Sequence, residues 1–336
     1  MRRLSAALAL ALWLLLLPSP AVAWGPDGHH SVGAIADRLI AGSNAALQVS
    51  SLLGGLSLED AAVWADCAKG IDPKQGYRYT SEGQYPECAI FENPAEEAAM
   101  ADYVRRNDTN CNPKPGEESC HKQYHYADIA IEHDHYDSGF VGAREDDIVH
   151  AVIAMTIVLQ GGPAPAPFNI KDKREALLLL AHYVGDVHQP LHVGAVYLNA
   201  SGQRVDPDSG TFSPATETRG GNQLLIDGNA HRKLHAAWDA VPASLKPAKV
   251  DSVLGPAARA VRASSGSVPD WPAEWATETQ QEAQRAFTGL TFGRKVNSTW
   301  SVKLPARYNA KATQIKTPQI EKAGARLAEL LHALWP

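Results

Sequence analysis

Two pairs of histidine and aspartate, each with four-residue spacing, are the residues of this sequence best suited to chemistry. His182 precedes Asp186, and His235 precedes Asp239. Residues four positions apart lie on one face of a helix, so each pair would point into a single space. Two such helices facing each other describe a site for several metal ions. Imidazole and carboxylate ligands without a thiolate suit zinc in a catalytic role.

The first pair lies in a segment that is typical of a buried helix. Residues 174–187 read REALLLLAHYVGDV, and Pro190 follows shortly after them. Proline would end this helix and allow His192 to turn back as a further ligand. His188 lies on another face of the helix, where we expect it to form a helix-end hydrogen bond instead of binding metal.

The N-terminus has the three parts of a secretory signal. Arg2 and Arg3 are basic, residues 4–17 are apolar, and an A-x-A cleavage signature ends at Ala23. The apolar stretch is too short for a typical membrane-spanning helix, and we find no later candidate. We therefore expect cleavage after Ala23, a mature chain that begins at Trp24, and a secreted or periplasmic protein without a membrane anchor.

The charge balance limits the kinds of partner. The chain has a formal net charge of -6, and removal of residues 1–23 would make it two units more negative, because Arg2 and Arg3 are lost. Such a protein has no global attraction for polyanions. Nucleic-acid binding would therefore be local, with metal cations supplying positive charge.

All four cysteines lie in one stretch of the chain, at Cys67, Cys88, Cys111 and Cys120. In an oxidising compartment they are expected to form two disulfides, for which three pairings are possible. Of these we favour Cys67–Cys88 with Cys111–Cys120. A cysteine zinc site is the alternative, but the sequence has no C-x-x-C pair to support it.

The periodicity of the rest of the chain predicts a mainly α-helical protein. Apolar residues recur at helical spacing in residues 31–41, 145–159 and 272–290, and Thr317-Pro318 is expected to open the last helix. A shorter helix is expected at residues 94–106. We expect a single domain over residues 24–336, because the candidate ligands spread along most of it.

Two stretches interrupt the helical pattern. Residues 67–122 are rich in Gly, Pro, Asn and Cys, and residues 193–228 are rich in Gly, Ser and Asp. Both are expected to be long surface loops or lids, and loops of this length often serve function. The second has room for one small β-hairpin before Gly220-Gly221-Asn222.

Six short motifs carry a resemblance to a known family. They are WGPDGH at 24–29, VWAD at 63–66, YHYAD at 124–128, HYVGDVHQPLH at 182–192, GGN at 220–222 and LHAAWD at 234–239. Together they resemble the zinc-dependent single-strand nuclease/3′-nucleotidase family of the S-one/P-one type, and the short Ala/Leu-rich leader suggests a bacterial secreted member. The resemblance implies the single-domain helical fold that this family shares with phospholipase C.

The resemblance also implies three zinc ions. Their ligands would be Asp66, His125, His182 and Asp186 for the first, His192, His235 and Asp239 for the second, and Trp24, His29 and Asp186 for the third. Trp24 would coordinate through its free amino group and its carbonyl. Cleavage after Ala23 would create that amine, and its proton is readily displaced by a metal.

The resemblance assigns the chemistry to a few further side chains. Two close metals would activate a water for attack on phosphorus, with Asp66 orienting it, and a third metal would stabilise the leaving oxygen. Lys69 would neutralise the phosphate, and Asn222 would reach the phosphate or the attacking water. Asp128 would bind the edge of a base and Tyr126 would stack on it. A base turned out of its stack explains a preference for single strands.

The implied activity is hydrolysis of single-stranded DNA and RNA to 5′-mononucleotides, together with 3′-nucleotidase activity, by a monomer. One alternative is a zinc-dependent phospholipase C. That family has His-x-x-x-Glu where this chain has His235 and Asp239, and its first histidine lies further from the tryptophan. A second alternative is a secreted zinc-binding protein without activity. The segments 67–122 and 193–228 are insertions relative to compact fungal nucleases. Both are expected to border the cleft, so the sequence does not determine the base preference.

Overall fold

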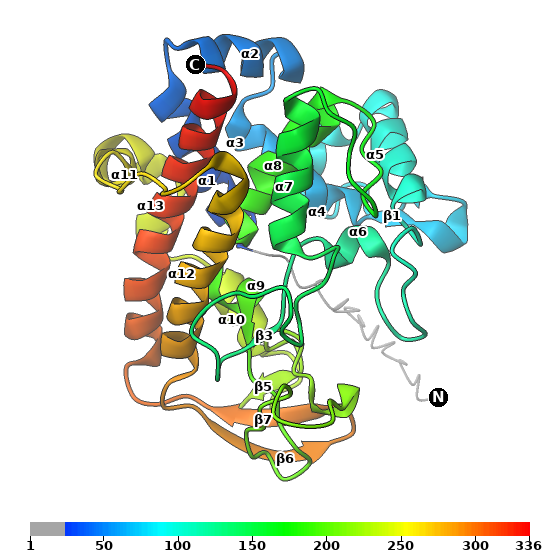
Figure 1. The fold of residues 1–336 in the computed structure, drawn as a ribbon, viewed down its shortest axis with the longest axis vertical. Coiled ribbons are helices and arrows are strands. Elements are labelled where there is room, and N and C mark those ends of the chain that lie inside the picture. The colour runs from blue at the N-terminus through cyan, green and yellow to red at the C-terminus, as the bar shows by residue number, and fades with distance from the viewer. Residues whose placement is uncertain (1–23) are drawn as a thin grey trace, which may run out of the picture.

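The computed structural model describes residues 24–336, so the predicted signal peptide and its cleavage site lie outside the described residues. The described chain is mainly α-helical, which confirms the predicted fold class (Figure 1). Its α-helices are α1 Pro26–Ile40, α2 Asn44–Leu53, α3 Leu58–Ala61, α4 Trp64–Ala68, α5 Pro94–Arg106, α6 Cys120–Gln123, α7 Ile148–Leu159, α8 Lys173–Asp186, α9 Pro190–Val193, α10 Leu234–Asp239, α11 Gly255–Ala258, α12 Trp271–Phe287 and α13 Tyr308–Leu334.

Helix α8 is the centre of the fold. Every residue from Glu175 to Asp186 is buried, and α1, α7 and α13 pack around the helix. The helix begins at an N-cap in which the Asp172 carboxylate accepts a hydrogen bond from the Glu175 amide over 2.9 Å. It ends at Asp186, and Pro190 then opens α9. A helix that is buried on all sides must be apolar along most of its length. The nearly continuous apolar run in this segment is the feature that predicted the helix.

The two longest helices, α12 and α13, run alongside each other down one side of the molecule (Figure 1). Helix α13 also packs on α1, where Gly324 allows a close approach: a Cβ atom there would lie 2.5 Å from the Ile35 Cβ. The prediction that Thr317-Pro318 opens the last helix is wrong, because Pro318 lies inside α13. The buried contacts of Ile315 and Ile320 on either side outweigh the one backbone hydrogen bond that proline removes.

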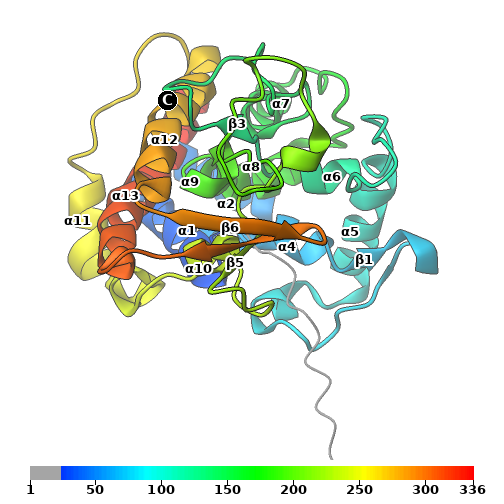
Figure 2. The same cartoon turned by 90° about the horizontal axis from the view of Figure 1, so that it is seen from below.

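The strands are short and form three small sheets. The largest contains β5 (Leu224–Ile226), β7 (Thr299–Lys303) and β6 (Thr291–Val296), with β7 in the middle, and it crosses the front of Figure 2. The other two sheets pair β1 (Ile71–Asp72) with β2 (Arg78–Tyr79), and β3 (Ile129–Ala130) with β4 (Gly194–Ala195).

The regular hairpin is formed by β6 and β7, not by residues 193–228 as the sequence suggested. Residues 193–228 contain β4, β5 and two isolated bridges, from Tyr197 to Glu217 and from Leu198 to Arg204. Trp300 and Val302 alternate with outward residues along β7 and are fully buried, which explains why the hairpin forms there. The segment 193–228 is otherwise a long loop, as predicted.

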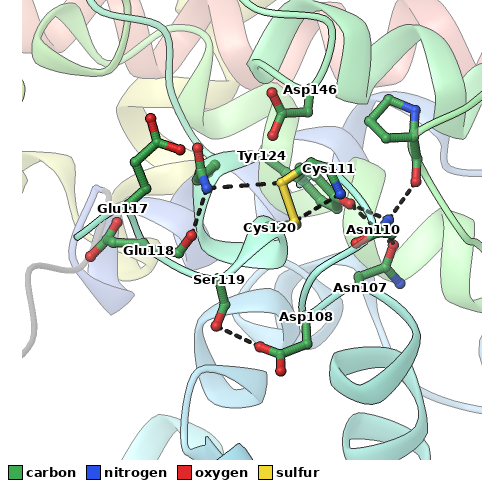
Figure 3. Close-up of a disulfide and its surroundings, with 12 residues drawn as sticks. Asn107, Asp108, Asn110, Cys111, Glu117, Glu118, Ser119, Cys120, Tyr124 and Asp146 are labelled. Atoms are coloured by element: carbon green, nitrogen blue, oxygen red, sulfur yellow. Dashed lines mark hydrogen bonds between the residues drawn. A yellow bond between two sulfur atoms is a disulfide. The ribbon is translucent and has the colours of Figure 1, made fainter. Parts of the chain in front are cut away.

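The helix that was expected at residues 94–106 of the first insertion is confirmed as α5. The rest of residues 67–122 is a folded unit and not the long loop that was expected. The whole insertion contains β1, β2, α5, α6 and a 3₁₀ helix at Pro86–Phe91. Both favoured disulfides are confirmed: Cys67 bonds to Cys88 over 1.98 Å, and Cys111 bonds to Cys120 over 2.07 Å. Figure 3 shows the second bond closing a loop beside Tyr124. Cross-links of this kind stabilise a segment that has few apolar residues of its own.

Among residues 24–336, no helix is both long enough and apolar enough to cross a membrane.

Candidate metal centre

Helix α8 brings one group of ligands together at its C-terminal end. The His182 Nε2 atom lies 3.1 Å from Asp186 Oδ2, as expected for residues four apart on a helix. His125, which follows α6, places its Nδ1 2.8 Å from the same carboxylate oxygen and 3.0 Å from His182 Nε2. The three side chains can therefore direct one ligand atom each toward a common point.

His29 from α1 and Asp66 from α4 complete this group. The His29 ring stacks on the His182 ring with centroids 3.8 Å apart, and His29 Nε2 lies 3.4 Å from Asp186 Oδ1. Asp66 Oδ1 lies 3.7 Å from His182 Nε2. The structure thus collects all the side chains that were predicted for the first and third zinc ions.

A second group joins α9 and α10. His192, His235 and Asp239 can place one ligand atom each within 4.8 Å of the others. The His235 Nε2 atom lies 3.7 Å from Asp239 Oδ2, again at four-residue spacing. His192 Nδ1 lies 3.6 Å from Asp186 Oδ1, so the second group adjoins the first.

Backbone carbonyls orient three of the histidines. The Nδ1 atoms of His182, His192 and His235 lie 2.6 to 2.7 Å from the carbonyl oxygens of Ala62, His125 and Gly220 respectively. A carbonyl can only accept a hydrogen bond, so each Nδ1 carries the proton and each Nε2 keeps a free lone pair. Such outer hydrogen bonds are the usual way in which proteins fix metal-binding imidazoles.

Several buried polar atoms of these groups have no hydrogen-bond partner. They include Asp186 Oδ1, Asp239 Oδ2, His192 Nε2 and both ring nitrogens of His29. Burying such atoms unpaired is costly, and a cluster of them indicates that a ligand satisfies them. Burial lowers the pKa of His29 to about 4, so its ring is neutral at pH 7, as a metal ligand must be. The donor set therefore fits metal cations.

The residue at the predicted mature N-terminus is fixed beside both groups. Trp24 is buried, and its indole Nε1 donates to the Gly185 carbonyl over 2.8 Å. The next amide, of Gly25, donates to the Asp239 carbonyl over 2.8 Å. Gly185 has no space for a larger residue, because a Cβ atom would lie 2.9 Å from His29 Nδ1. Trp24 is thus held between Gly185, which precedes Asp186, and the C-terminal end of α10.

Lys69 reaches the centre although it lies at the start of the insertion. Its Nζ lies 2.6 Å from Asp66 Oδ1, and its side chain is only 15% exposed. Burial alone would lower the pKa of Lys69, but Asp66 and Asp186 raise it above its usual value, so the ammonium stays charged. The Cys67–Cys88 disulfide leaves this contact intact.

Asp128, Tyr126 and Asn222 lie beside the metal ligands, and each is partly buried. Tyr126 and Asp128 flank His125 in the chain, and Asn222 lies in the turn after Gly220. Two buried oxygen atoms, Asn222 Oδ1 and Asp128 Oδ1, have no hydrogen-bond partner. Burial, reinforced by Glu217, raises the pKa of Asp128 to about 8. Asp128 is therefore mostly protonated at pH 7 and can donate a hydrogen bond as well as accept one.

The sequence did not identify Gln189, which supports the second group. Its Nε2 donates to Asp239 Oδ1 over 2.9 Å, and its Oε1 accepts from the Leu191 amide over 2.6 Å. The signal was its position between two candidate ligands, immediately before Pro190. His188 behaves as predicted, since its Nδ1 bonds to the Val184 carbonyl oxygen at the end of α8 over 2.7 Å.

Comparison with known proteins agrees with this geometry. The family model described as S1/P1 Nuclease matches residues 24–335. The chain therefore belongs to the S1/P1 nuclease family. Two similar proteins from Arabidopsis thaliana are "Endonuclease 5", 26% identical over 229 residues, and "Endonuclease 1", 26% identical over 243 residues. These matches cover 65% and 70% of this chain but only 56% and 60% of those relatives.

Proposed function

We propose that this protein is a secreted, monomeric, zinc-dependent nuclease that hydrolyses single-stranded DNA and RNA to 5′-mononucleotides and also removes phosphate from 3′-nucleotides. Family membership supports nuclease chemistry. The observation that carries the zinc dependence is the set of buried histidine and aspartate atoms that lack partners in two adjoining groups. The two disulfides are typical of an oxidising compartment outside the cytoplasm.

Three zinc ions are proposed to bind at these groups, with the ligands Asp66, His125, His182 and Asp186, then His192, His235 and Asp239, then Trp24, His29 and Asp186. The two Asp186 oxygens approach different histidines: Oδ2 lies 2.8 Å from His125 Nδ1, and Oδ1 lies 3.4 Å from His29 Nε2. This arrangement supports a carboxylate that contributes to both the first and the third site. When bound, zinc supplies Lewis-acid chemistry: it acidifies water and offsets the charge of the phosphate.

The remaining charged and polar groups act on the phosphate. The Lys69 ammonium, buried against Asp66, supplies positive charge where the anionic phosphate would enter. Asp66 binds metal and orients the attacking water. The amide of Asn222, with an unpartnered buried oxygen, is placed to hold that water or the phosphate.

Tyr126 and Asp128 are proposed to hold a base. An aromatic ring supplies a stacking surface for any base, and a carboxyl group reads the base edge. A base can enter such a pocket only when it leaves the helical stack, which favours single-stranded substrates.

The first experiment uses protein that begins at Trp24, loaded with zinc, on a single-stranded oligonucleotide with and without a chelator. We expect release of 5′-mononucleotides, resolved by chromatography, and loss of the activity on chelation. An intact oligonucleotide in the presence of verified zinc would contradict the proposal. Phosphatidylcholine is then the next substrate to test, and tight zinc binding without hydrolysis of any phosphoester would favour the zinc-binding alternative.

Replacement of Asp128 by asparagine should alter base preference and leave zinc content unchanged. In the wild type, the preference among 3′-mononucleotides should shift as pH rises through about 8, because the carboxyl group loses the proton that it donates. In Asp128→Asn that shift should disappear. The measurement is kcat/KM for the four 3′-mononucleotides between pH 6 and pH 9, alongside metal analysis. An unchanged order and pH profile would remove the role assigned to Asp128.

A further inference from the structure

The turn at residues 218–223 lies between Asp128 and the second metal group. The Gly220 carbonyl accepts a hydrogen bond from His235 Nδ1 over 2.7 Å. On the other side, Tyr197 forms a bridge with Glu217 and donates its hydroxyl to the Asp128 carbonyl over 2.7 Å. Two backbone bonds hold the turn closed, from the Asn222 amide to the Arg219 carbonyl over 2.9 Å and from the Gln223 amide to the Thr218 carbonyl over 3.0 Å.

Arg219 occupies a backbone conformation that favours glycine. Its φ is 51°, and the following Gly220 and Gly221 have φ values of 54° and 85°. A glycine at position 219 would adopt this conformation without a steric penalty, whereas an arginine does so at some cost. Residues held in such conformations often serve function.

The guanidinium of Arg219 is exposed and forms no ion pair among residues 24–336. Its Nη2 makes a long 3.5 Å contact with the Gly116 carbonyl oxygen. Its charge lowers the pKa of the Glu217 carboxyl, against the larger effect of burial. Arg144 differs, because it pairs with Asp146 over 2.9 Å and with Glu117 over 3.3 Å. Gly116 belongs to the loop that the Cys111–Cys120 disulfide closes (Figure 3), so the contact that Arg219 makes is to a constrained segment.

The turn that carries Arg219 is tied to residues on both of its sides. The metal ligand His235 bonds to Gly220, the residue after Arg219. Glu217, two residues before Arg219, forms a bridge with Tyr197, whose hydroxyl bonds to the Asp128 carbonyl. Arg219 therefore lies on a turn between Asp128 and His235, and its guanidinium is suited to an oxyanion.

We propose that Arg219 binds the phosphate on the 5′ side of the nucleoside held by Tyr126 and Asp128. This inference rests on the proposed function, in which the scissile phosphate lies on the 3′ side at the metal ligands. A guanidinium is well matched to phosphate, since its planar donors can bind two oxygens at once. The contact would make Arg219 a specificity residue that favours polynucleotides and 5′-phosphorylated substrates over simple 3′-mononucleotides.

The test compares adenosine 3′,5′-bisphosphate with adenosine 3′-monophosphate, by calorimetric binding and by kcat/KM on zinc-loaded protein. The wild type should prefer the bisphosphate, and Arg219→Gln should lose roughly tenfold of that preference while acting normally on the monophosphate. For an oligonucleotide, the slope of log affinity against log salt should fall by about one. Arg204→Gln is the matched control, because Arg204 lies in the same loop but is paired with Glu132 over 2.6 Å.

The Arg219→Gly variant distinguishes an effect of the arginine side chain from an effect of the turn conformation. Glycine suits the φ of 51°, so this variant should fold at least as stably as the wild type and yet lose the same preference as Arg219→Gln. Equal binding of the two adenosine nucleotides by the wild type, or an unchanged preference in both Arg219 variants, would overturn the inference. Failure of the wild type to hydrolyse either nucleotide would instead contradict the proposed function, while the binding comparison would still decide the role of Arg219.

Discussion

Replacement of Asp186 by alanine is expected to abolish activity and to remove the two zinc ions that are proposed to share its carboxylate. One oxygen lies 2.8 Å from His125 Nδ1 and 3.1 Å from His182 Nε2, and the other lies 3.4 Å from His29 Nε2. Removing the carboxylate leaves three buried histidines without the negative charge that favours cation binding. The rate should fall at least about a thousandfold, since metal stabilisation of this kind is worth several kcal/mol.

Metal content by mass spectrometry and oligonucleotide hydrolysis measure this effect. Asp37→Asn is a suitable control for general loss of stability. Asp37 accepts hydrogen bonds from the Leu58 and Glu59 amides, each over 3.1 Å, and none of its hydrogen bonds is to a ligand. That variant should unfold more easily but keep its zinc. Full zinc content in Asp186→Ala would show that the carboxylate does not bridge.

A single extra residue before Trp24 is expected to remove the third zinc ion and most of the activity. Trp24 is fully buried, and hydrogen bonds from its indole Nε1 to Gly185 and from the Gly25 amide to Asp239 fix its position. The extension converts the free amine to an amide, which is a poor metal ligand. Loss of one of the two close metals that are proposed to activate the water should cost at least about a hundredfold in kcat.

Trp24→Phe provides the matched control for the extension. It keeps the terminal amine but loses the indole hydrogen bond to Gly185, so it should retain zinc while the free energy of unfolding falls by about 1 kcal/mol. Zinc stoichiometry and denaturant unfolding distinguish the two variants. If the extended protein binds as much zinc as the mature form, the amine is not a ligand.

Features that depend on neighbouring residues in the sequence could be predicted, whereas features that depend on contacts between distant segments could not. Helix α8 was predicted within one residue at each end, because its apolar run, its ligand spacing and Pro190 are all local signals. The last helix was misplaced, because the packing of α13 on α1 outweighs the local cost of Pro318. The β6–β7 hairpin was missed, since its stability depends on burying Trp300 and Val302 under distant segments.

The sequence by itself determined which histidines and aspartates share a helix face, and it predicted a metal site from them. Histidine and aspartate four residues apart on a helix must share a face, and this holds for His182 with Asp186 and for His235 with Asp239. Only the tertiary structure decided that Gln189 supports Asp239 and that Arg219 forms no ion pair among residues 24–336. Both features depend on how separate segments pack, which local spacing does not specify.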